Sequence, residues 1–438
     1  MSSSKKIIFL IITAGVVIRI FLFVHFLKEP QFFYDDDSYN YTQVAENLRL
    51  GNGFSWHKEA PFKPEGFRTP AYPLFLLGHR VAFGNYNSAL VTQIFLIAVT
   101  AYLIYAIARD FANRPKTGLL AAALFLFSPF SLMVSLNFLT QTLFTFILTL
   151  AVWTWLKFLK TSANKYFFYS AVLFPISTLI RPIAFLILVP FFASFFVQAF
   201  LNKRPNFNWR RGIKLLCAAI VLFISILSPW LIRNYRVFNS FSLSTIKYYQ
   251  LYFYDLPPIY GRAKGITNQE ASKILTEEFH NITGIADRSS THEYARDFAY
   301  SKLLKERFLR YLAQMPGAAL ITRLDFMFKF FIRDGIRYWI HYYTNGSISG
   351  LLLLPVILER GYLFLVFTGM LIFAVQNLRS ERKNTFSFFS LLFLVILYFD
   401  FLTGIMASAG LRFPVEPLFL LLGLSGLDMA RKRVFDTL

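Results

Sequence analysis

The chain alternates long apolar runs with shorter polar connections. The apolar runs number about ten, and most approach the roughly 20 residues that a helix needs to cross the hydrocarbon core of a bilayer. They lie at residues 7–27, 88–108, 118–136, 138–156, 166–180, 183–201, 213–231, 353–375, 386–405 and 413–430. Because only helices and closed barrels satisfy their backbone hydrogen bonds in lipid, we predict an all-α polytopic membrane protein with about ten transmembrane helices.

Basic residues between the runs predict the orientation of these helices. Clusters lie before the first run and after every second run, at residues 5–6, 109–116, 157–165, 202–214, 379–383 and 431–433. All of them share one side of the membrane if both termini are cytoplasmic, as the positive-inside rule requires. The first run lacks an A-x-A cleavage site, so we expect it to remain as the first span of a multi-pass cell-membrane protein.

Composition agrees with a membrane protein and excludes two other classes. Hydrophobic residues make up 56% of the 438 residues and charged residues 16%, whereas soluble domains are about 25% charged. The net charge of +21 would suit nucleic acid, but the charges lie between apolar runs, so we expect membrane lipids and no nucleic acid as partners. The single cysteine, Cys217, excludes a disulfide framework and a cysteine-based metal site.

The expected topology leaves two long polar segments on the external face, residues 28–87 and 232–352. The second is too long for a simple connection, and its apolar residues recur at helical spacing. We therefore expect an N-terminal transmembrane module at 1–231, an external helical subdomain at 232–352 and C-terminal transmembrane helices at 353–438. The aromatic stretch 247–260 predicts either an interfacial belt or a platform on which sugar rings or isoprenes stack.

Candidate chemistry gathers on this external face. Three adjacent aspartates, Asp35, Asp36 and Asp37, open the first external loop. Four arginines lie at external ends of runs or in the external loops: Arg68, Arg181, Arg233 and Arg412. Each arginine alone could snorkel to headgroups, but ionisable groups at membrane depth usually pair with one another or with a ligand. Since the guanidinium fork matches phosphate, the set predicts an acidic group facing a cationic pocket for an anionic headgroup.

The acidic triplet raises the question of which donor such a site would take. An Asp-x-Asp pattern is known from enzymes that hold nucleotide-sugars through a divalent metal, because paired carboxylates suit hard cations. Asp35 and Asp37 are expected outside the cell, where nucleotide-sugars are not normally supplied. A glycosyl donor would therefore be lipid-linked and reach the site through the membrane, and its phosphate would need the arginines.

Five motifs resemble a known family and appear in its order. They are "DDDSYNYTQVAENLRLGNGFS", "FRTPAYPLFL", "LIRP", "PWLIRNYRVFNSF" and "LRFPVEPLFLLL". Together they resemble the GT-C superfamily of polyprenyl-phosphate-sugar-dependent glycosyltransferases, in its protein mannosyltransferase and aminoarabinose transferase branch. The resemblance runs from the first span to the last and does not cover the loop after residue 240. It implies an inverting transferase on the external face, with a polyprenyl-phosphate sugar as donor and a lipid, glycan or protein as acceptor.

The resemblance also implies roles for individual residues. In the family the catalytic base is a carboxylate eight residues before an alanine, and counting back from Ala45 leads to Asp37. Asp36 is the second candidate for the base, or a ligand for a divalent metal; we expect no required cofactor, and a divalent metal is an open alternative. Asp35, Tyr41 and the four arginines are the expected substrate contacts.

One position departs from the family. Many relatives carry an acid near the start of the fourth span, in a pattern like Ser-Glu-x-Leu-Phe, where this chain has "LTQTLFTF" with Gln141. A glutamine can hydrogen-bond a sugar hydroxyl or a carboxylate but carries no charge. Gln141 is therefore expected to shape the substrate pocket, and a mechanism with a second acid in the membrane is not supported.

Two other functions fit the same topology. A transporter or flippase for a lipid-linked glycan would also need arginines and lateral entry, but the paired repeats that such proteins often show are not visible. An envelope polysaccharide polymerase would place its main chemistry in the later external loops. The transferase is the favoured prediction.

Overall fold

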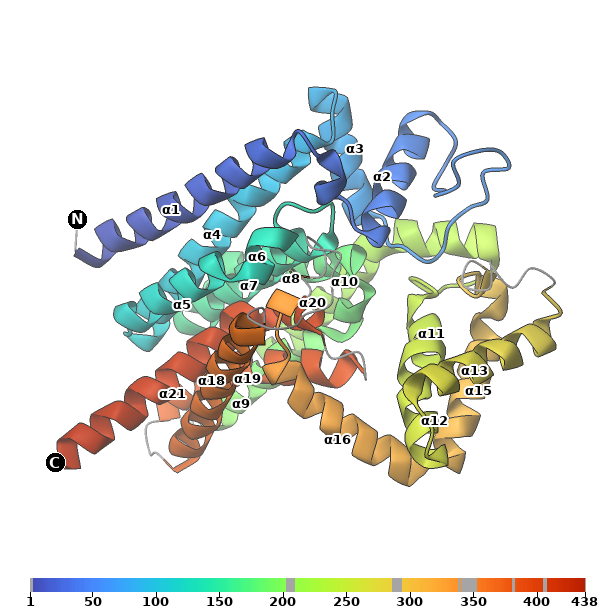
Figure 1. Ribbon diagram of the computed structural model, residues 1–438. Helices are drawn as coiled ribbons and strands as arrows, with labels where there is room; N and C mark the ends of the chain where they lie inside the picture. Colours follow the sequence, from blue (N-terminus) through green and yellow to red (C-terminus); the bar gives the residue numbers. More distant parts are fainter. Residues whose placement is uncertain are drawn as a thin grey trace.

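The computed structural model describes residues 3–201, 209–285, 294–337, 340, 353–379, 383–404 and 408–437. Every regular element in these ranges is a helix (Figure 1). The first half contains α1 (Ser3–Phe26), a short helix at Pro30–Phe33, α2 (Asp36–Arg49), α3 (Ala71–Phe83), α4 (Asn87–Ala112), α5 (Pro115–Phe127), α6 (Pro129–Val134), α7 (Thr140–Thr161), α8 (Asn164–Ile180), a short helix at Pro182–Leu186, α9 (Leu188–Leu201) and α10 (Trp209–Phe238).

The second half begins with a group of helices beyond the bundle and ends with three more bundle helices. The group contains α11 (Ile246–Gln250), a π-helix at Leu251–Asp255, α12 (Leu256–Lys264), α13 (Asn268–Thr283), α15 (Phe298–Gln314) and α16 (Pro316–Ile332). The later elements are α18 (Leu353–Arg379), α19 (Lys383–Leu402), α20 (Ala409–Arg412), a short helix at Phe413–Val415 and α21 (Glu416–Thr437).

The predicted fold class, a polytopic all-α membrane protein, is confirmed. Each of the ten predicted runs overlaps one or more helices of the structure. Among the described residues, six helical segments are long and apolar enough to cross a membrane: Ser3–Phe26, Asn87–Ala112, Thr140–Thr161, Trp209–Phe238, Leu353–Gln376 and Ala409–Arg433. Three others are shorter apolar helices, at Pro115–Phe127, Pro182–Val197 and Phe389–Leu402. The number of ten spans stays a prediction.

One predicted run, at 118–136, is divided in the structure. Proline has no N–H to continue a helix, and α5 ends where Pro129 follows Ser128. The Ser128 hydroxyl accepts a hydrogen bond from the Ser131 backbone N–H at 3.1 Å and so caps α6. The division exposes carbonyl and hydroxyl oxygen atoms in the middle of the bundle, and these need donors.

Arg19 in α1 supplies those donors. Its side chain is fully buried, and it donates to the carbonyl of Leu126 at 2.8 Å, to the hydroxyl of Ser131 at 2.9 Å and to the hydroxyl of Ser135 at 3.0 Å. A fourth bond goes to the carbonyl of Gly15 in its own helix. Buried charges persist only with such partners, so this arginine fixes α1 against the break between α5 and α6.

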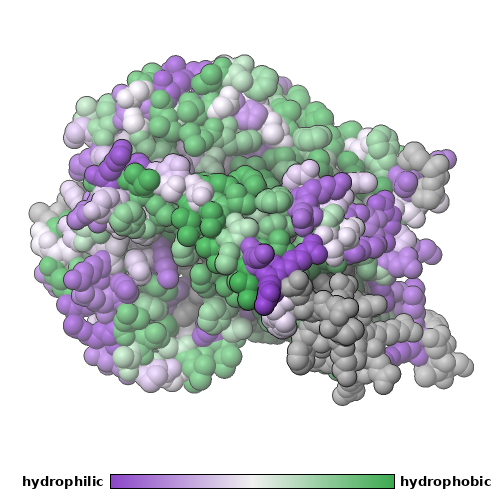
Figure 2. Space-filling model, turned by 180° about the vertical axis from the view of Figure 1, so that it is seen from behind, coloured by the Kyte–Doolittle hydropathy of each residue, from purple (hydrophilic) through white to green (hydrophobic). Residues whose placement is uncertain are grey.

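The bundle has two chemically distinct ends. Both chain termini lie at one end and helices α11 to α15 lie at the other (Figure 1). Apolar residues fill much of the middle of the molecule in Figure 2, and hydrophilic residues gather toward its left and right sides. At the end with the termini, Arg114 pairs with Asp428 at 2.7 Å and Lys157 pairs with Asp110 at 3.3 Å. Several predicted basic clusters thus meet at one end of the bundle, and the assignment of this end to the cytoplasm stays a prediction.

The aromatic stretch 247–260 contributes to a core of its own. Tyr249, Tyr252 and Phe253 are 4%, 1% and 6% exposed, and they pack with side chains of α13 and α15. The two sequence-based alternatives, an interfacial belt and a stacking platform, are therefore wrong for these three rings. Helical spacing alone could not distinguish an interfacial ring from one covered by a second layer of helices, which here buries them.

Replacing Arg19 with methionine tests the anchor of α1. Arg19→Met keeps the length of the side chain but leaves four oxygen atoms without this donor, so we expect a loss of about 2 kcal/mol in the free energy of unfolding. The measurement is thermal unfolding of purified protein in detergent. The control is Arg49→Met, which removes an exposed pair with Glu46 and is expected to cost about 0.5 kcal/mol. Equal losses for the two variants would contradict the anchoring role.

Candidate functional site

The acidic triplet lies at the start of α2. The backbone N–H of Ser38 donates to the carbonyl of Asp35 at 2.8 Å, and the N–H of Asp35 donates to the Ser38 hydroxyl at 3.0 Å. These two bonds set the first turn of α2, from which Asp37 projects. The helix ends at Arg49, and Gly51 then adopts a positive φ of 80°, a conformation that glycine adopts readily.

A second segment of the same loop carries Arg68. Hydrogen bonds of its neighbours Gly66, Phe67 and Thr69 hold this segment in place. The N–H of Thr245 donates to the carbonyl of Gly66 at 3.1 Å, and the Ser244 hydroxyl donates to the carbonyl of Phe67. The Thr69 hydroxyl donates to the carbonyl of Ile180 at the end of α8, at 3.1 Å. The position of Arg68 is thus determined jointly by α8 and by the chain that follows α10.

The two segments meet in an ion pair. The Arg68 Nη2 atom lies 2.7 Å from Asp37 Oδ1, and Nη1 donates to the Tyr41 hydroxyl at 3.2 Å. The guanidinium also lies over the Tyr41 ring, 4.7 Å from its centre, which adds a cation–π attraction. The Arg68 side chain is 3% exposed and that of Asp37 is 55% exposed. The carboxylate therefore reaches solvent while its cation stays buried.

The charges around Asp37 keep it ionised. Partial burial raises the pKa of this carboxyl, but the charge and hydrogen bond of Arg68, together with the charges of Arg296 and Arg181, outweigh that effect. The net result is a pKa below the ordinary value for aspartate. At neutral pH Asp37 is a carboxylate that can accept a proton.

Three arginines near Asp37 carry buried nitrogen atoms that no group in the described part of the chain binds. They are Nε of Arg68, Nη1 of Arg181 and Nε of Arg296. Arg181 follows α8 directly, and its guanidinium lies 5.7 Å from the centre of the Phe144 ring. Since buried donors are normally satisfied, this group of donors is suited to an anion with several oxygen atoms.

Arg296 and Glu65 belong to this site although the sequence analysis missed both. Arg296 precedes α15, and its guanidinium lies over the rings of Phe67 and Tyr249, at 4.9 and 5.7 Å. Glu65 is 6% exposed, and its Oε2 atom has no hydrogen-bond partner among the described residues. Neither residue lies at the boundary of an apolar run, so the pattern that identified the other arginines could not identify them.

Arg233 lies close to this loop but serves its backbone. Its Nη1 atom donates to the carbonyl of Glu65 at 2.7 Å and to the side-chain oxygen of Asn234 at 2.8 Å. Its guanidinium lies 4.8 Å from the centre of the Trp230 ring. Arg233 therefore fixes the loop that carries Arg68 to α10.

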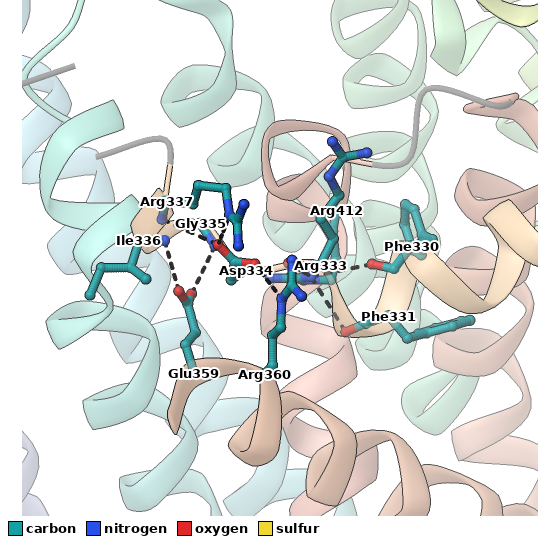
Figure 3. A network of polar contacts seen from close by, with 10 residues as sticks. All are labelled: Phe330, Phe331, Arg333, Asp334, Gly335, Ile336, Arg337, Glu359, Arg360 and Arg412. Atoms are coloured by element: carbon teal, nitrogen blue, oxygen red, sulfur yellow. Dashed lines mark hydrogen bonds and ion pairs between the residues drawn. The ribbon is translucent and has the colours of Figure 1, made fainter. Parts of the chain in front are cut away.

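Arg412 lies in a different network, shown in Figure 3. Its Nη1 atom donates to the carbonyls of Phe330, Phe331 and Arg333 at 3.2, 3.4 and 2.7 Å. These carbonyls close the last turn of α16, where a cation is favoured. Arg412 Nε lies 3.7 Å from Glu416 in α21. The donors described for Arg412 therefore cap α16, and the arginine charges that act on Asp37 come from Arg68, Arg296 and Arg181.

The same network joins α16 to α18. The Glu359 carboxylate in α18 accepts hydrogen bonds from the backbone N–H groups of Gly335 and Ile336, at 3.1 and 2.7 Å (Figure 3). The neighbouring Arg360 pairs with Asp334 at 2.6 Å. The chain that leaves α16 is thus bound on both sides, which fixes the junction between the helices beyond the bundle and the C-terminal helices.

Gln141 lies in the first turn of α7 and faces the segment before Arg412. A side chain added at Gly410 would meet the Gln141 amide nitrogen at 3.7 Å. The Gln141 Oε1 atom is buried and has no hydrogen-bond partner within the described ranges. An amide with an unused acceptor is suited to a hydroxyl donor.

Metal ligation finds no support among the described residues. No three histidine, cysteine, aspartate or glutamate side chains there are grouped so that they could hold a metal ion. The Asp36 side chain, the second candidate for the base or a metal ligand, lies outside what the structure describes.

Comparison with known proteins supports the resemblance seen in the motifs. Residues 68–232 match the family model described as dolichyl-phosphate-mannose-protein mannosyltransferase. The resemblance to protein mannosyltransferases is confirmed over that segment, which begins at Arg68, contains Arg181 and ends one residue before Arg233. No curated protein matches the chain in sequence.

Two solved structures match the chain at low sequence identity. AglB, an oligosaccharyltransferase from Archaeoglobus fulgidus in complex with an inhibitory peptide and a dolichol-phosphate, is 11% identical with a TM-score of 0.49. The match covers 100% of this chain and 52% of that one, so the chain spans about half the length of AglB. ArnT from Cupriavidus metallidurans in the apo state is 12% identical with a TM-score of 0.38, and the match covers 93% of this chain and 77% of that one.

Gly66 tests whether close packing positions the loop of Arg68. A Cβ atom at Gly66 would overlap the ring of Phe298, which is stacked on Phe238 at 4.6 Å and cannot move away freely. We therefore expect Gly66→Ala to cost about 2 kcal/mol in the free energy of unfolding. In the control Gly78→Ala the new Cβ meets nothing within 4 Å, and a gain of up to about 1 kcal/mol is expected in this helix. Thermal unfolding in detergent compares the two, and an unchanged midpoint for Gly66→Ala would contradict the packing argument.

Proposed function

We propose that this chain is an inverting glycosyltransferase of the GT-C type that acts on the external face of the membrane. It takes a sugar from a polyprenyl-phosphate donor and passes it to a lipid, glycan or protein acceptor. The observation that carries the proposal is the Asp37–Arg68 ion pair, 2.7 Å long and acted on by the charges of Arg181 and Arg296. The match of residues 68–232 to a mannosyltransferase family that uses a lipid-linked donor supports it.

The arginine group is suited to the donor's phosphate. Arg68, Arg181 and Arg296 each have a buried N–H donor without a partner in the described chain. A phosphate diester presents oxygen acceptors in the geometry that guanidinium groups match. Such contacts strengthen as the polyprenyl phosphate leaves and gains negative charge, which stabilises the transition state more than the bound donor.

Asp37 is the group suited to the acceptor. Its carboxylate is ionised and half exposed, so an acceptor hydroxyl or amine can reach it. In the proposed step the acceptor oxygen or nitrogen forms a bond to the anomeric carbon while its proton passes to Asp37. The bond between the anomeric carbon and the phosphate oxygen breaks, its electron pair leaves with polyprenyl phosphate, and attack from the opposite face inverts the configuration.

Arg68 connects these two events. Its ion pair lowers the pKa of Asp37 and so weakens it as a base. When the departing phosphate draws the guanidinium, the attraction on the carboxylate falls and its proton affinity rises. Base strength then increases at the stage of the reaction that releases the acceptor proton.

The remaining predicted site residues shape the pocket. Tyr41 holds Arg68 through its hydroxyl and its ring, and the unused oxygen of Gln141 is suited to a sugar hydroxyl. Arg233 and Arg412 hold the chain segments around the pocket in place. Arg233 donates to the backbone of the loop that carries Arg68, and Arg412 donates to the carbonyls at the end of α16. Asp35 sets the first turn of α2 through its backbone.

Asp37→Asn tests the base. The amide keeps the shape of the side chain but cannot take the proton, so we expect sugar transfer from a polyprenyl-phosphate sugar to fall by about 10²–10⁴-fold. The measurement is turnover of purified protein in nanodiscs with a radiolabelled donor. The control is Glu46→Gln in the same helix, whose carboxylate pairs with Arg49. A near wild-type rate for Asp37→Asn would show that the base is assigned wrongly.

The same preparation distinguishes an enzyme from a transporter. Vesicles that contain the protein and a fluorescent lipid-linked glycan report movement of lipid between leaflets, and the glycan's mass reports transfer. Movement of the lipid by the wild-type protein without any transferred sugar would overturn the proposed function in favour of a flippase.

Arg181→Gln tests the phosphate contact. Removal of one guanidinium from the group should weaken donor binding, and we expect the KM for the donor to rise about tenfold, as for the loss of one charged hydrogen bond. The KM for the acceptor should change little. The control Arg109→Gln removes a cation at the opposite end of the bundle, where it pairs with Asp110. An unchanged donor KM for Arg181→Gln would exclude this arginine from the phosphate site.

A further inference from the structure

Glu65 is a buried acid that the proposed mechanism does not use. It lies in the loop before Arg68 and is 6% exposed. Its carboxyl accepts a hydrogen bond from the backbone N–H of Arg68, which leaves Oε2 without a partner in the part of the chain that the structure describes. A buried carboxyl with one unused oxygen is costly unless nearby charges compensate for it.

Arginines from three different elements face this carboxyl. Arg68 comes from the same loop, Arg233 from α10 and Arg296 from the chain before α15, and the charge of each acts on Glu65. Two of them, Arg68 and Arg296, also act on Asp37 and carry an unused Nε donor. The same two guanidinium groups therefore act on both carboxyls and still keep a donor for an external anion.

Burial and these charges have opposite effects on Glu65. Burial raises the pKa of the carboxyl, and Arg68, Arg296 and Arg233 lower it, with a net pKa of about 7. Below that pH Glu65 is neutral and the arginines keep their full positive charge. Above it Glu65 is an anion that neutralises part of that charge, and an external anion is then attracted less strongly.

We propose that Glu65 is a positioning residue that competes with the donor's phosphate for Arg68 and Arg296, so that its protonation controls how tightly this site holds an anion. The hydrogen bond from the Arg68 backbone N–H to the Glu65 carboxyl orients Arg68. The charge of Glu65 sets how strongly the arginines attract an external anion. The inference rests on the proposed function for the identity of the anion. Glu65 makes the affinity for an anion depend on pH near neutrality. The ion pair of Asp37 and Arg68 does not do so, because Asp37 stays ionised there.

Binding of a phosphodiester across pH tests the proposal. The probe is farnesyl methyl phosphate, a diester whose single charge does not change between pH 6 and 8.5, unlike a phosphate monoester with a second pKa near 6. We expect the wild-type Kd to rise about tenfold over this range, which corresponds to a coupling of about one pKa unit between Glu65 and the anion. The measurement is calorimetry or thermophoresis of the full chain in nanodiscs.

Glu65→Gln removes the titrating group and keeps the side chain's size. We expect this variant to bind the probe at every pH about as tightly as the wild type does at pH 6. Glu65→Asp retains a carboxyl and is expected to retain a pH dependence. The matched control is Glu278→Gln, which removes a carboxylate contacted by Arg307 and Tyr311 away from this site and should keep the wild-type slope.

Each outcome has a distinct meaning. A wild-type Kd that does not change with pH, or a Glu65→Gln variant that keeps the wild-type slope, overturns the role of Glu65. If Glu65→Gln does not fold, the test rests on the change of Kd with pH in the wild type and in Glu65→Asp. A Kd that is independent of pH in both proteins overturns the proposal. Absence of probe binding by the wild type at all pH values would instead contradict the donor class of the proposed function.

Discussion

The ion pair of Asp37 and Arg68 is the interaction on which the candidate site depends. It joins two segments between α1 and α3 that are 31 residues apart, and each segment is held by different helices. Asp37 is set by the first turn of α2, and Arg68 by contacts with α8 and with the chain after α10. A buried guanidinium is stable only with such compensation, so the packing of three parts of the molecule converges on one pair of charges.

The arginines of this protein divide by what they bind. Arg19 and Arg412 give their hydrogen bonds to carbonyl or hydroxyl oxygen atoms at helix ends and breaks, and such arginines hold helices together. Arg68, Arg181 and Arg296 act on the charge of Asp37 and each keep a buried donor unused, whereas the unused Nε of Arg412 lies 3.7 Å from the Glu416 carboxylate. Unused buried donors cost free energy in the unbound protein, and an arriving anion removes that cost. This is a physical reason to regard Arg68, Arg181 and Arg296 as a binding site.

The helices beyond the bundle contribute to the candidate site. Phe67, next to Arg68, is 6% exposed and packs in their core, and Arg296 lies over its ring. At the other end of these helices, Arg412 and Glu359 fix the end of α16 to the C-terminal bundle. These helices are therefore joined to the bundle at two places, and one of them is the arginine group itself.

The sequence by itself determined the membrane class, the helical runs and the choice of Asp37, Arg68 and Arg181 as candidates, and it predicts a common side for the basic clusters. Those properties follow from local periodicity and from the cost of charge in lipid, which act on consecutive residues. Only the tertiary structure decided that Arg412 caps α16, that Tyr249 and Tyr252 are buried, and that the charges of Arg68 and Arg296 act on both Asp37 and Glu65. Those facts depend on which distant segments pack together, and a charge at a given position carries no local mark of the partner that the fold brings to it.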